Sequence, residues 1–230
     1  MTIQQIHDRF LHFYDKQSNF SAPEITAEEI DIYLNRAQSD FIDDIIARGS
    51  EKNNEYSDRL KNLIIPYSTN TFVAGTKPNG YKVNIPLDYR SAQSEEVSIT
   101  YADCNGTTVS KRIPVVPITR DEYNDFIKDP FNLPWFEEVK RLAQSNNQFE
   151  IICSSTLTPT TYYLDYLKIA NSMQNGAQYS TPLVDIQCEL DETAQHIIID
   201  KAVLIALKTI GDPRIQLDNI EYQSQLNKIK

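Results

Sequence analysis

The sequence is poor in the residues on which several common classes of site depend. Its 230 residues include six glycines, and these form no dinucleotide-binding or phosphate-binding loop. Its three cysteines, Cys104, Cys153 and Cys188, lie far apart and form no C-x-x-C pair. No histidine or basic cluster near Cys104 or Cys153 would activate a thiol. The cysteines therefore indicate a reducing compartment and small apolar packing residues rather than thiol chemistry.

Long apolar runs are also absent. No stretch approaches membrane-spanning length, and the start, "MTIQQIHDRF", lacks the apolar core of a signal peptide. We therefore expect a protein that is made in the cytosol, is not secreted and does not enter a membrane. With 40% hydrophobic and 23% charged residues, the composition is that of a globular protein. No low-complexity linker divides the chain, so we expect a single domain over residues 1–230.

Basic residues are outnumbered: 22 Lys and Arg stand against 32 Asp and Glu, which gives a net charge of −10. An acidic chain gains no affinity from neutralising phosphates, so the charge argues against a DNA-binding module. An acidic surface would still be useful where DNA must slide past without sticking. Solubility alone is the simpler explanation of the same charge.

No catalytic pattern is found either. His7 and His12 are five residues apart, on different sides of a helix, and His196 precedes an apolar run. No H-E-x-x-H or G-x-S-x-G motif occurs. Acidic residues that are adjacent on one element do not form the cleft that general acid–base catalysis needs. They are Asp43 with Asp44, Glu95 with Glu96, and Glu137 with Glu138, and the group Asp121, Glu122 and Asp125 lacks the alternation of a calcium loop. We expect no enzyme, no cofactor and no metal site.

Helices are predicted at both ends of the chain. Residues 3–17 form a modest amphipathic helix, and a helix over 26–46 begins with a capping box of Thr26 and Glu29. In that helix Ile30, Leu34 and Phe41 are expected to face inward. A short helix over 58–64, ended by Pro66, completes a mostly helical segment 1–65. At the other end, residues 190–211 are apolar on most of the helix circumference and predict a buried helix, followed by a polar tail over 212–230.

Between these helices, residues 66–188 change to short runs rich in β-branched and aromatic residues. Turn signals separate the runs, and Asn105-Gly106 predicts a hairpin. The runs are "STNTFVAG", "YKVNIP", "EVSITYAD", "TTVSKRIPVVPI", "QFEIIC" and "TTYYLDYLKIA". The order predicts an α+β fold, with N-terminal helices, a small antiparallel sheet interrupted by a short helix, and a C-terminal buried helix.

The interrupting segment, "RDEYNDFIKDPFNLPW", begins as a helix and then runs into two prolines, each followed at once by an aromatic residue. Thr119 and Glu122 form a second capping box, and Ile118 with Tyr123 form its hydrophobic staple. Tyr123, Phe126 and Ile127 give the helix one apolar face. A helical stub over 119–129 is predicted, because Pro130 removes the next amide donor and disfavours a helical Asp129.

The chain after the stub predicts a stiff aromatic arm. Pro130 and Pro134 restrict the backbone, and Phe131 and Trp135 supply large rings. Stiffening reduces the conformational entropy that such an arm loses when it docks. We interpret Tyr123, Pro130, Phe131, Pro134 and Trp135 as a docking device. The sequence leaves open whether its rings pack on this chain's own sheet or on a neighbouring chain.

Four segments together resemble a known family. They are "ITAEEIDIYLNRAQSDFIDDIIARG", "VPITRDEYNDFIKDPFNLPW", "YYLDYLKI" and "LDETAQHIIIDKAVLIALKTIGDPR". They look like the ring, or head–tail connector, proteins that crAss-like short-tailed phages stack below the portal. The resemblance covers most of residues 24–216, and its most specific element is the capped stub followed by "DPF". Family members commonly carry a basic residue after that phenylalanine, where this chain has Asn132 and Leu133.

The resemblance implies a virion protein assembled in the host cytoplasm. It implies a ring, expected to contain twelve copies, that contacts the portal or other ring and tail proteins and surrounds passing DNA without binding it specifically. It implies no catalytic activity, cofactor or membrane contact. A tail-side adaptor or gatekeeper ring on the tail barrel is the alternative within the virion. A non-viral small-molecule-binding domain or hydrolase is the alternative outside it.

Overall fold

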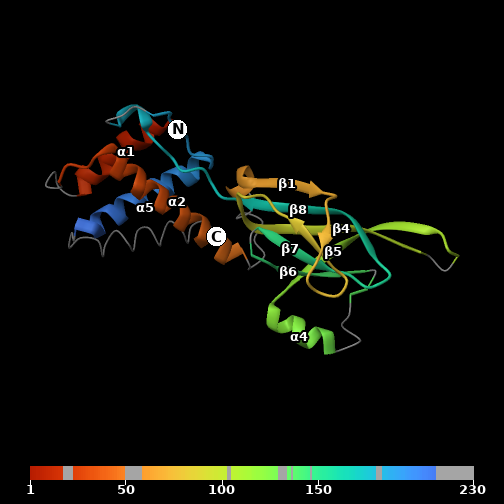
Figure 1. Cartoon of the computed structure of the whole chain (residues 1–230). Helices are drawn as coiled ribbons and strands as arrows, with labels where there is room; N and C mark the ends of the chain where they lie inside the picture. The colour runs from red at the N-terminus through yellow and green to blue at the C-terminus, as the bar shows by residue number, and fades with distance from the viewer. Residues whose placement is uncertain are drawn as a thin grey trace. The chain divides into compact units, whose positions relative to one another are not determined.

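The chain divides into two compact units in the computed structural model, which is shown in Figure 1. The model describes residues 1–17, 23–49, 59–102, 105–128, 134–135, 137–145, 147–179 and 183–210. The helical unit comprises Met1–Leu63 and the chain from Ala170 onward, and the β unit comprises Ile64–Ile169. The first boundary lies within two residues of the expected change at residue 65. The β unit, however, ends at Ile169 and not at 188, because the chain after β8 is hydrogen-bonded to α2. That the two units act as one connector domain stays a prediction.

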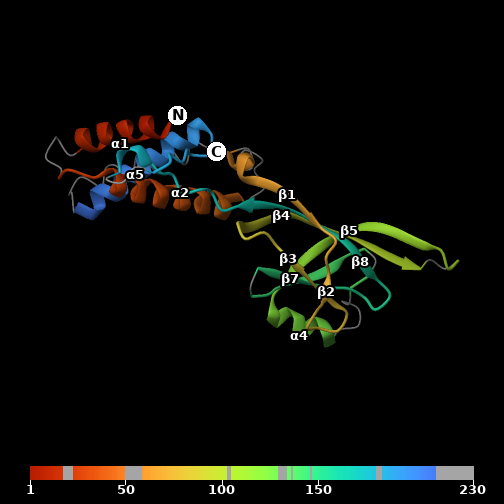
Figure 2. The same ribbon diagram turned by 45° about the horizontal axis from the view of Figure 1, so that its top comes forward.

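Three long helices build the helical unit: α1 (Ile3–Gln17), α2 (Ala27–Gly49) and α5 (Glu192–Ile210). The helix α5 packs against both α1 and α2, and Figures 1 and 2 show the three helices side by side. Most of the α5 circumference is buried, including Ile198, Ala202 and Val203. The predicted buried C-terminal helix is therefore confirmed. The residues predicted to form the polar tail lie outside the described part of the chain.

The start of α2 follows from its sequence. The Thr26 N–H donates to Glu29 Oε2 at 2.9 Å, and the Glu29 N–H donates to Thr26 Oγ1 at 3.3 Å, so the predicted capping box is confirmed. Ile30, Leu34 and Phe41 are all buried, as their spacing predicted. Burying each side chain contributes about 1.5–3 kcal/mol relative to leaving it exposed. The inward face of α2 is thus a main support of this unit.

The β unit is an eight-stranded sheet with one helix. Its elements are β1 (Ile64–Thr69), β2 (Val73–Ala74), β3 (Gly80–Asn84), β4 (Tyr89–Ala102), β5 (Thr108–Ile118), α4 (Arg120–Lys128), β6 (Val139–Ala143), β7 (Gln148–Ile152) and β8 (Thr158–Lys168). The strand order is β1-β8-β4-β5-β6-β7-β3-β2. All pairs are antiparallel except β5 and β6, whose connection contains α4. The α+β class, the hairpin after Ala102 and the stub are confirmed.

The sheet is larger than predicted, because two of its strands, β1 and β6, were not expected. Only Arg59 and Leu60 and the 3₁₀ turn Lys61–Leu63 are helical where a helix to Ile64 was expected, and Pro66 does not end it. Pro66 lies inside β1 instead, opposite Asp165. The prediction failed because β1 is an edge strand, where a missing N–H is tolerated. The short strand β6 was missed because "VKRLA" is only five residues long and its two adjacent charged residues break the alternation typical of a strand.

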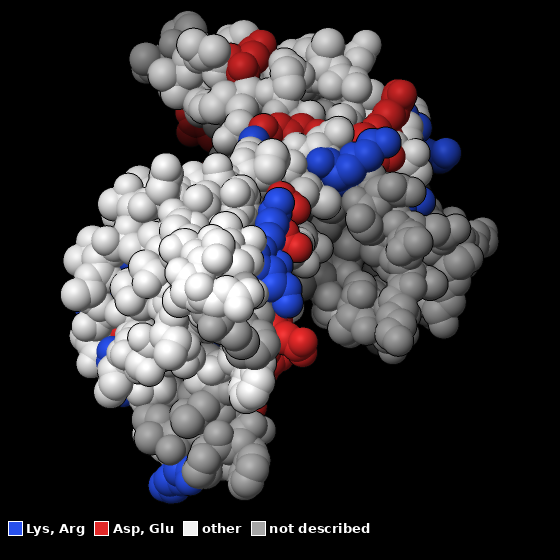
Figure 3. Space-filling model, turned by 90° about the vertical axis from the view of Figure 1, so that its right-hand side faces the viewer, with Lys and Arg blue, Asp and Glu red and all other residues white. Residues whose placement is uncertain are grey.

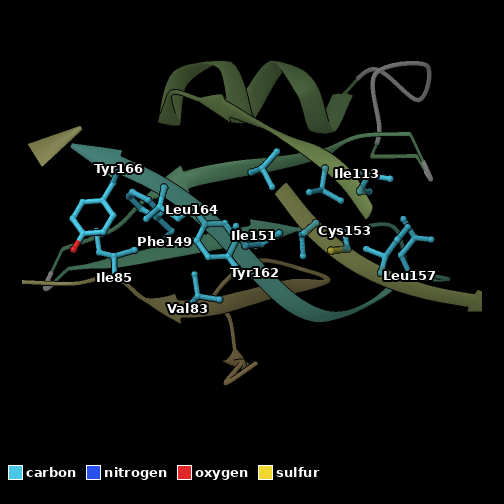
Figure 4. Packing of buried hydrophobic residues seen from close by; sticks show 14 residues of the cluster. Val83, Ile85, Ile113, Phe149, Ile151, Cys153, Leu157, Tyr162, Leu164 and Tyr166 are labelled. Carbon is cyan, nitrogen blue, oxygen red and sulfur yellow. The ribbon is translucent and has the colours of Figure 1, made fainter. Parts of the chain in front are cut away.

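The core of the β unit lies on one face of this curled sheet. Alternate residues of β4, β7 and β8 point into it, as the two-residue period of strands requires. Figure 4 shows Tyr162 and Leu164 of β8 turned toward Phe149 and Ile151 of β7. The opposite face of β6 and β7 carries Leu142 and Ile152, which pack on α4. The sheet therefore has one face for its own core and a second face, at one end, for the stub.

Candidate assembly site

The helix α4 is capped as the sequence predicted. The Thr119 N–H donates to Glu122 Oε2 at 2.7 Å, and the Glu122 N–H donates to Thr119 Oγ1 at 3.2 Å. The hydrogen bonds from the Thr119 backbone and side chain lower the pKa of the Glu122 carboxyl below its usual value. Ile118 packs in the same cluster as Tyr123, so the predicted staple is also confirmed. The start of α4 is fixed by local interactions alone.

Tyr123 holds α4 on the sheet. Its ring is 4% exposed and packs on Leu142 of β6 and Ile152 of β7. Lys77 Nζ lies 4.5 Å from the centre of the ring, a cation–π contact that reaches α4 from the loop between β2 and β3. Within the interpreted docking device, Tyr123 therefore serves as the fixed base from which the arm starts.

The arm itself is described only at its end. Asp129, Pro130 and Phe131 lie outside the described residues. Pro134 is buried, while Trp135 is 59% exposed. The Trp135 N–H donates to the Glu138 carbonyl at 3.2 Å and the Glu138 N–H donates back at 3.3 Å, which closes a tight turn leading into β6. A large, exposed aromatic side chain is thus presented from a backbone that is hydrogen-bonded to the residue just before β6.

A buried carboxylate, which the sequence analysis did not single out, fixes the loop that carries Lys77. Glu150 of β7 is fully buried. It accepts hydrogen bonds from the backbone N–H groups of Thr76 at 2.5 Å and Lys77 at 2.7 Å, and from Gln144 Nε2 at 2.6 Å. A β-carbon on the glycine at either end of this loop, Gly75 or Gly80, would collide with Glu150 Oε1. The signal was a glutamate amid apolar residues in "QFEIIC".

Glu150→Gln is expected to destabilise the β unit by about 1–3 kcal/mol at pH 7, because an amide cannot accept all these hydrogen bonds. Burial raises the pKa of Glu150, but the hydrogen bonds from Lys77, Thr76 and Gln144 outweigh it and leave the pKa lowered. A lowered pKa stabilises the fold above the unfolded-state value of about 4.3, and this stabilisation is lost as the pH falls through the folded-state value. Urea unfolding across pH 3–7 should show the variant and the wild type converging in acid. A constant difference would contradict this account.

Other polar clusters bind parts of the chain to one another. In the helical unit, Asp31 of α2 is buried and its Oδ1 lies 2.7 Å from His7 Nε2 of α1. Asp31 Oδ2 accepts from the Asn175 N–H at 3.0 Å and the Tyr179 hydroxyl at 2.7 Å. Burial and the hydrogen bond to Asp31 raise the pKa of Tyr179 to about 12. His7, dismissed above as part of a catalytic pair, therefore belongs to a buried hydrogen-bond network.

Two more residues on the same face of α2 also bind the chain that follows β8. Asn35 exchanges two hydrogen bonds with the backbone of Met173, at 2.7 and 2.9 Å, and Gln38 Nε2 donates to the Asn171 carbonyl at 3.1 Å. The signal in the sequence was a polar stripe at positions i, i+4 and i+7, formed by Asp31, Asn35 and Gln38. These residues attach the chain after β8 to the helices.

The adjacent carboxylates take different places. Glu95 points into the β core, where its Oε2 lies 2.9 Å from Arg141 Nε and accepts from the Tyr162 hydroxyl at 2.8 Å. Its neighbour Glu96 pairs with Arg112 at the surface. Burial raises the pKa of Glu95, and Arg141 partly offsets this. Burial alone raises the pKa of the Cys153 thiol to about 12, consistent with a packing residue.

Two further findings concern the described residues only. No three His, Cys, Asp or Glu side chains gather there in a way that would hold a metal ion. None of the helices in the described ranges is long and apolar enough to cross a membrane.

Comparison with known proteins identifies a family. The family model described as phage tail ring protein 3/4 matches residues 1–212, which include the β unit, the helices α1, α2 and α5, and the whole of α4 and its arm. No curated protein matches the chain. The match covers the segments on which the resemblance rested, from the capped helix α2 to α5. The chain therefore belongs to the family of phage tail ring proteins 3/4 and is a structural ring protein of a crAss-like bacteriophage virion.

Proposed function

We propose that this chain forms a closed ring in the head–tail connector, below the portal, where it continues the DNA channel and bridges portal to tail. The ring would contain twelve copies, assemble in the host cytoplasm and act during genome ejection. Family membership supports a ring. The observation that carries an assembly role for this site is the fixed presentation of Trp135, a large aromatic residue 59% exposed beside a buried Pro134. Exposed aromatic side chains on rigid backbone are typical anchors of protein interfaces.

The charge supports passage of DNA without capture. The helical unit holds 20 acidic and 12 basic residues, and the β unit holds 12 and 10. On the face drawn in Figure 3, basic side chains stand beside acidic ones in a narrow strip next to a broad uncharged area. A surface of this kind offers phosphates little net attraction. The channel wall of the proposed ring is therefore net acidic or mixed in charge.

The proposal includes no catalytic turnover. Three buried carboxylates among the described residues are engaged in internal contacts: Glu95 with Arg141 and Tyr162, Asp31 with His7, and Glu150 with the loop before β3. Groups held in this way stabilise a fold and are not directed at a substrate. The proposed mechanism is assembly, in which many copies each contact two neighbours and the contacts add up to closure of the ring.

Negative-stain imaging of the purified chain, alone and mixed with a portal protein of the same phage, tests this function. Rings that stack on the portal are expected. Rings that bind only the tail barrel would instead support a tail-side adaptor. Monomers in every mixture would overturn the proposal.

Trp135→Ala should leave a folded chain with a near-normal melting temperature but impair ring formation or docking. The side chain is more than half exposed, and the turn that holds it depends on backbone hydrogen bonds to Glu138. Truncating an aromatic anchor costs about 2 kcal/mol or more, roughly thirtyfold in affinity per contact. Melting temperature and sedimentation, measured on one preparation, provide the test.

Tyr123→Ala is the matched control, because Tyr123 is buried within the unit. It should lower the melting temperature first. If Trp135→Ala melts several degrees lower and assembles whenever it is folded, Trp135 packs on its own chain and is not an assembly anchor.

A further inference from the structure

Three of the six glycines follow an asparagine, and the three Asn-Gly pairs lie in different surroundings. Asn79-Gly80 leads into β3, and Asn105-Gly106 lies in the hairpin between β4 and β5. Asn175-Gly176 leads into the 3₁₀ turn Gly176–Gln178 of the helical unit. Because the dipeptide is the same in all three places, a large difference in its reactivity must come from the fold.

An Asn-Gly pair can lose its side-chain amide without an enzyme. The backbone nitrogen of the glycine attacks the asparagine Cγ, so that a five-membered imide ring closes. The bond from Cγ to Nδ2 breaks, and ammonia leaves with the proton of the glycine N–H. Water then opens the ring at either carbonyl and leaves an aspartate or an isoaspartate. Glycine favours ring closure because it has no side chain to obstruct the attack, but its nitrogen must still be able to turn toward the amide.

Asn79-Gly80 is held by backbone hydrogen bonds. The Gly80 N–H, which would have to attack, donates to the Lys77 carbonyl at 3.0 Å, and the Asn79 carbonyl accepts from the Cys153 N–H at 3.1 Å. Gly80 is buried, and a β-carbon added to it would lie 2.5 Å from Glu150 Oε1. Rotation of this peptide must therefore break hydrogen bonds and collide with neighbouring atoms.

Asn175-Gly176 is held through the asparagine itself. Asn175 is 1% exposed, and its Nδ2 donates to Gln4 Oε1 of α1 at 3.3 Å. Its backbone N–H donates to Asp31 Oδ2 of α2 at 3.0 Å. A β-carbon on Gly176 would lie 2.5 Å from the backbone of Leu183, so the glycine has no room to turn. The amide that would be attacked is thus buried and bonded.

Asn105-Gly106 has none of these restraints on its glycine. The pairing of β4 with β5 ends at Ala102 opposite Thr108, so the pair lies beyond the last strand contact. Both residues are exposed, and Gly106 has a φ of 74°, in the region that favours glycine. Apart from its neighbours in the chain, no atom of the described residues lies within 4 Å of where a Gly106 β-carbon would be. Figures 1 and 2 show this end of the hairpin projecting beyond the other strands.

We propose that Asn105 is a site of spontaneous deamidation, whereas the fold protects Asn79 and Asn175. The reaction replaces a neutral amide by a carboxylate and so adds one negative charge to a chain of net charge −10. The isoaspartate product also lengthens the backbone by one carbon atom. The core is not disturbed, because the site lies beyond the last pair of the hairpin. A population of chains therefore becomes mixed in charge at the hairpin as it ages, whether or not the chain forms the proposed ring.

Incubation of the full-length protein in water enriched in heavy oxygen tests the assignment, because a carboxyl group formed during incubation carries the label. A mildly alkaline pH is used, since the attacking nitrogen then loses its proton more readily. Digestion in mild acid and tandem mass spectrometry locate the label. Asn105 should be labelled at least about tenfold faster than Asn79 or Asn175, because these two react only after local opening of the fold. Equal labelling of the three sites, or an unlabelled Asn105, would overturn the proposal.

The same incubation in urea separates the effect of the fold from that of the sequence. The three pairs should then react at similar rates, because they share one dipeptide. If Asn105 keeps the same lead in the unfolded chain, the fold does not protect the other two and the proposal is wrong.

Asn105→Gln is the matched variant, because a glutamine would have to close a less favourable ring and its position is exposed. Isoelectric focusing of the intact wild type should show more acidic species accumulating with time, whereas the variant should largely lack them at an unchanged melting temperature. Acidic species that form equally fast in the variant would place the reaction elsewhere and contradict the assignment of Asn105.

Discussion

Arg141→Met is expected to destabilise the β unit by about 3–5 kcal/mol, the usual cost of removing one partner from a buried ion pair. Arg141 Nε lies 2.9 Å from Glu95 Oε2, and the two side chains are only 11% and 6% exposed. The alignment is poor for a hydrogen bond from Nε, so the contact is mainly an ion pair. The guanidinium also lies 4.0 Å from the centre of the Phe149 ring. Its loss leaves the Glu95 carboxylate buried without a countercharge.

The stability lost in Arg141→Met should depend on pH. Burial already raises the pKa of Glu95, with Arg141 and the Tyr162 hydroxyl acting against it. Without Arg141, that pKa rises further. A carboxyl whose pKa is raised in the folded state favours folding below the unfolded-state value, and this advantage is lost as the pH rises through the folded-state value. The variant should therefore be closest to the wild type in mild acid and furthest from it at neutral pH.

Arg112→Met is the matched control, because Arg112 pairs with Glu96, the next residue of the same strand, at the surface. The side chains there are 53% and 41% exposed, so their ion pair contributes about 1 kcal/mol or less. Urea unfolding compares the two variants, and hydrogen exchange of the β4 and β8 amides locates the change. A similar, small effect of both variants would mean that Glu95 is well solvated. The double variant Glu95→Met/Arg141→Met should recover part of the loss, since no unpaired charge remains.

The elements that could be predicted from the sequence are those encoded by local rules. Two capping boxes, an all-round apolar helix and an Asn-Gly turn each depend on residues within a few positions of one another. The structure confirms them at Thr26, Thr119, α5 and the turn before β5. Membership of a ring family followed from the same segments.

The features that the sequence did not reveal depend on partners far along the chain. Pro66 in β1 could be understood only once β1 was known to lie at the edge of the sheet. Glu95 and Glu96 look alike in sequence, but successive side chains of a strand point to opposite faces. Glu95 therefore points into the core beside Arg141, 46 residues away along the chain, whereas Glu96 points to the surface. Asp31 finds its partners 144 and 148 residues away. A local pattern can mark such a residue, as the polar stripe marks Asp31, but it does not identify the distant partner.

Asp31→Asn is expected to destabilise the helical unit by about 3 kcal/mol, because at least one buried donor loses its acceptor. The carboxylate accepts from two directions: His7 on one oxygen, and the Asn175 N–H and Tyr179 hydroxyl on the other. An asparagine has one acceptor oxygen, so its amide group must face a donor on one side. The variant should lower the stability of the whole helical unit and, in addition, loosen the segment that Asp31 holds. Amides of residues 174–179 should exchange hydrogen much faster, while the α5 amides change only with overall stability.

Glu28→Gln, at an exposed position one turn earlier on α2, is the control and should leave both readouts unchanged. The experiment also decides how residues 174–179 are held on α2. If Asp31→Asn lowers the melting temperature but leaves residues 174–179 as protected as in the wild type, the carboxylate supports the helices only. Residues 174–179 would then owe their protection to Gln4 and to the bridge between Gln174 and Ile186.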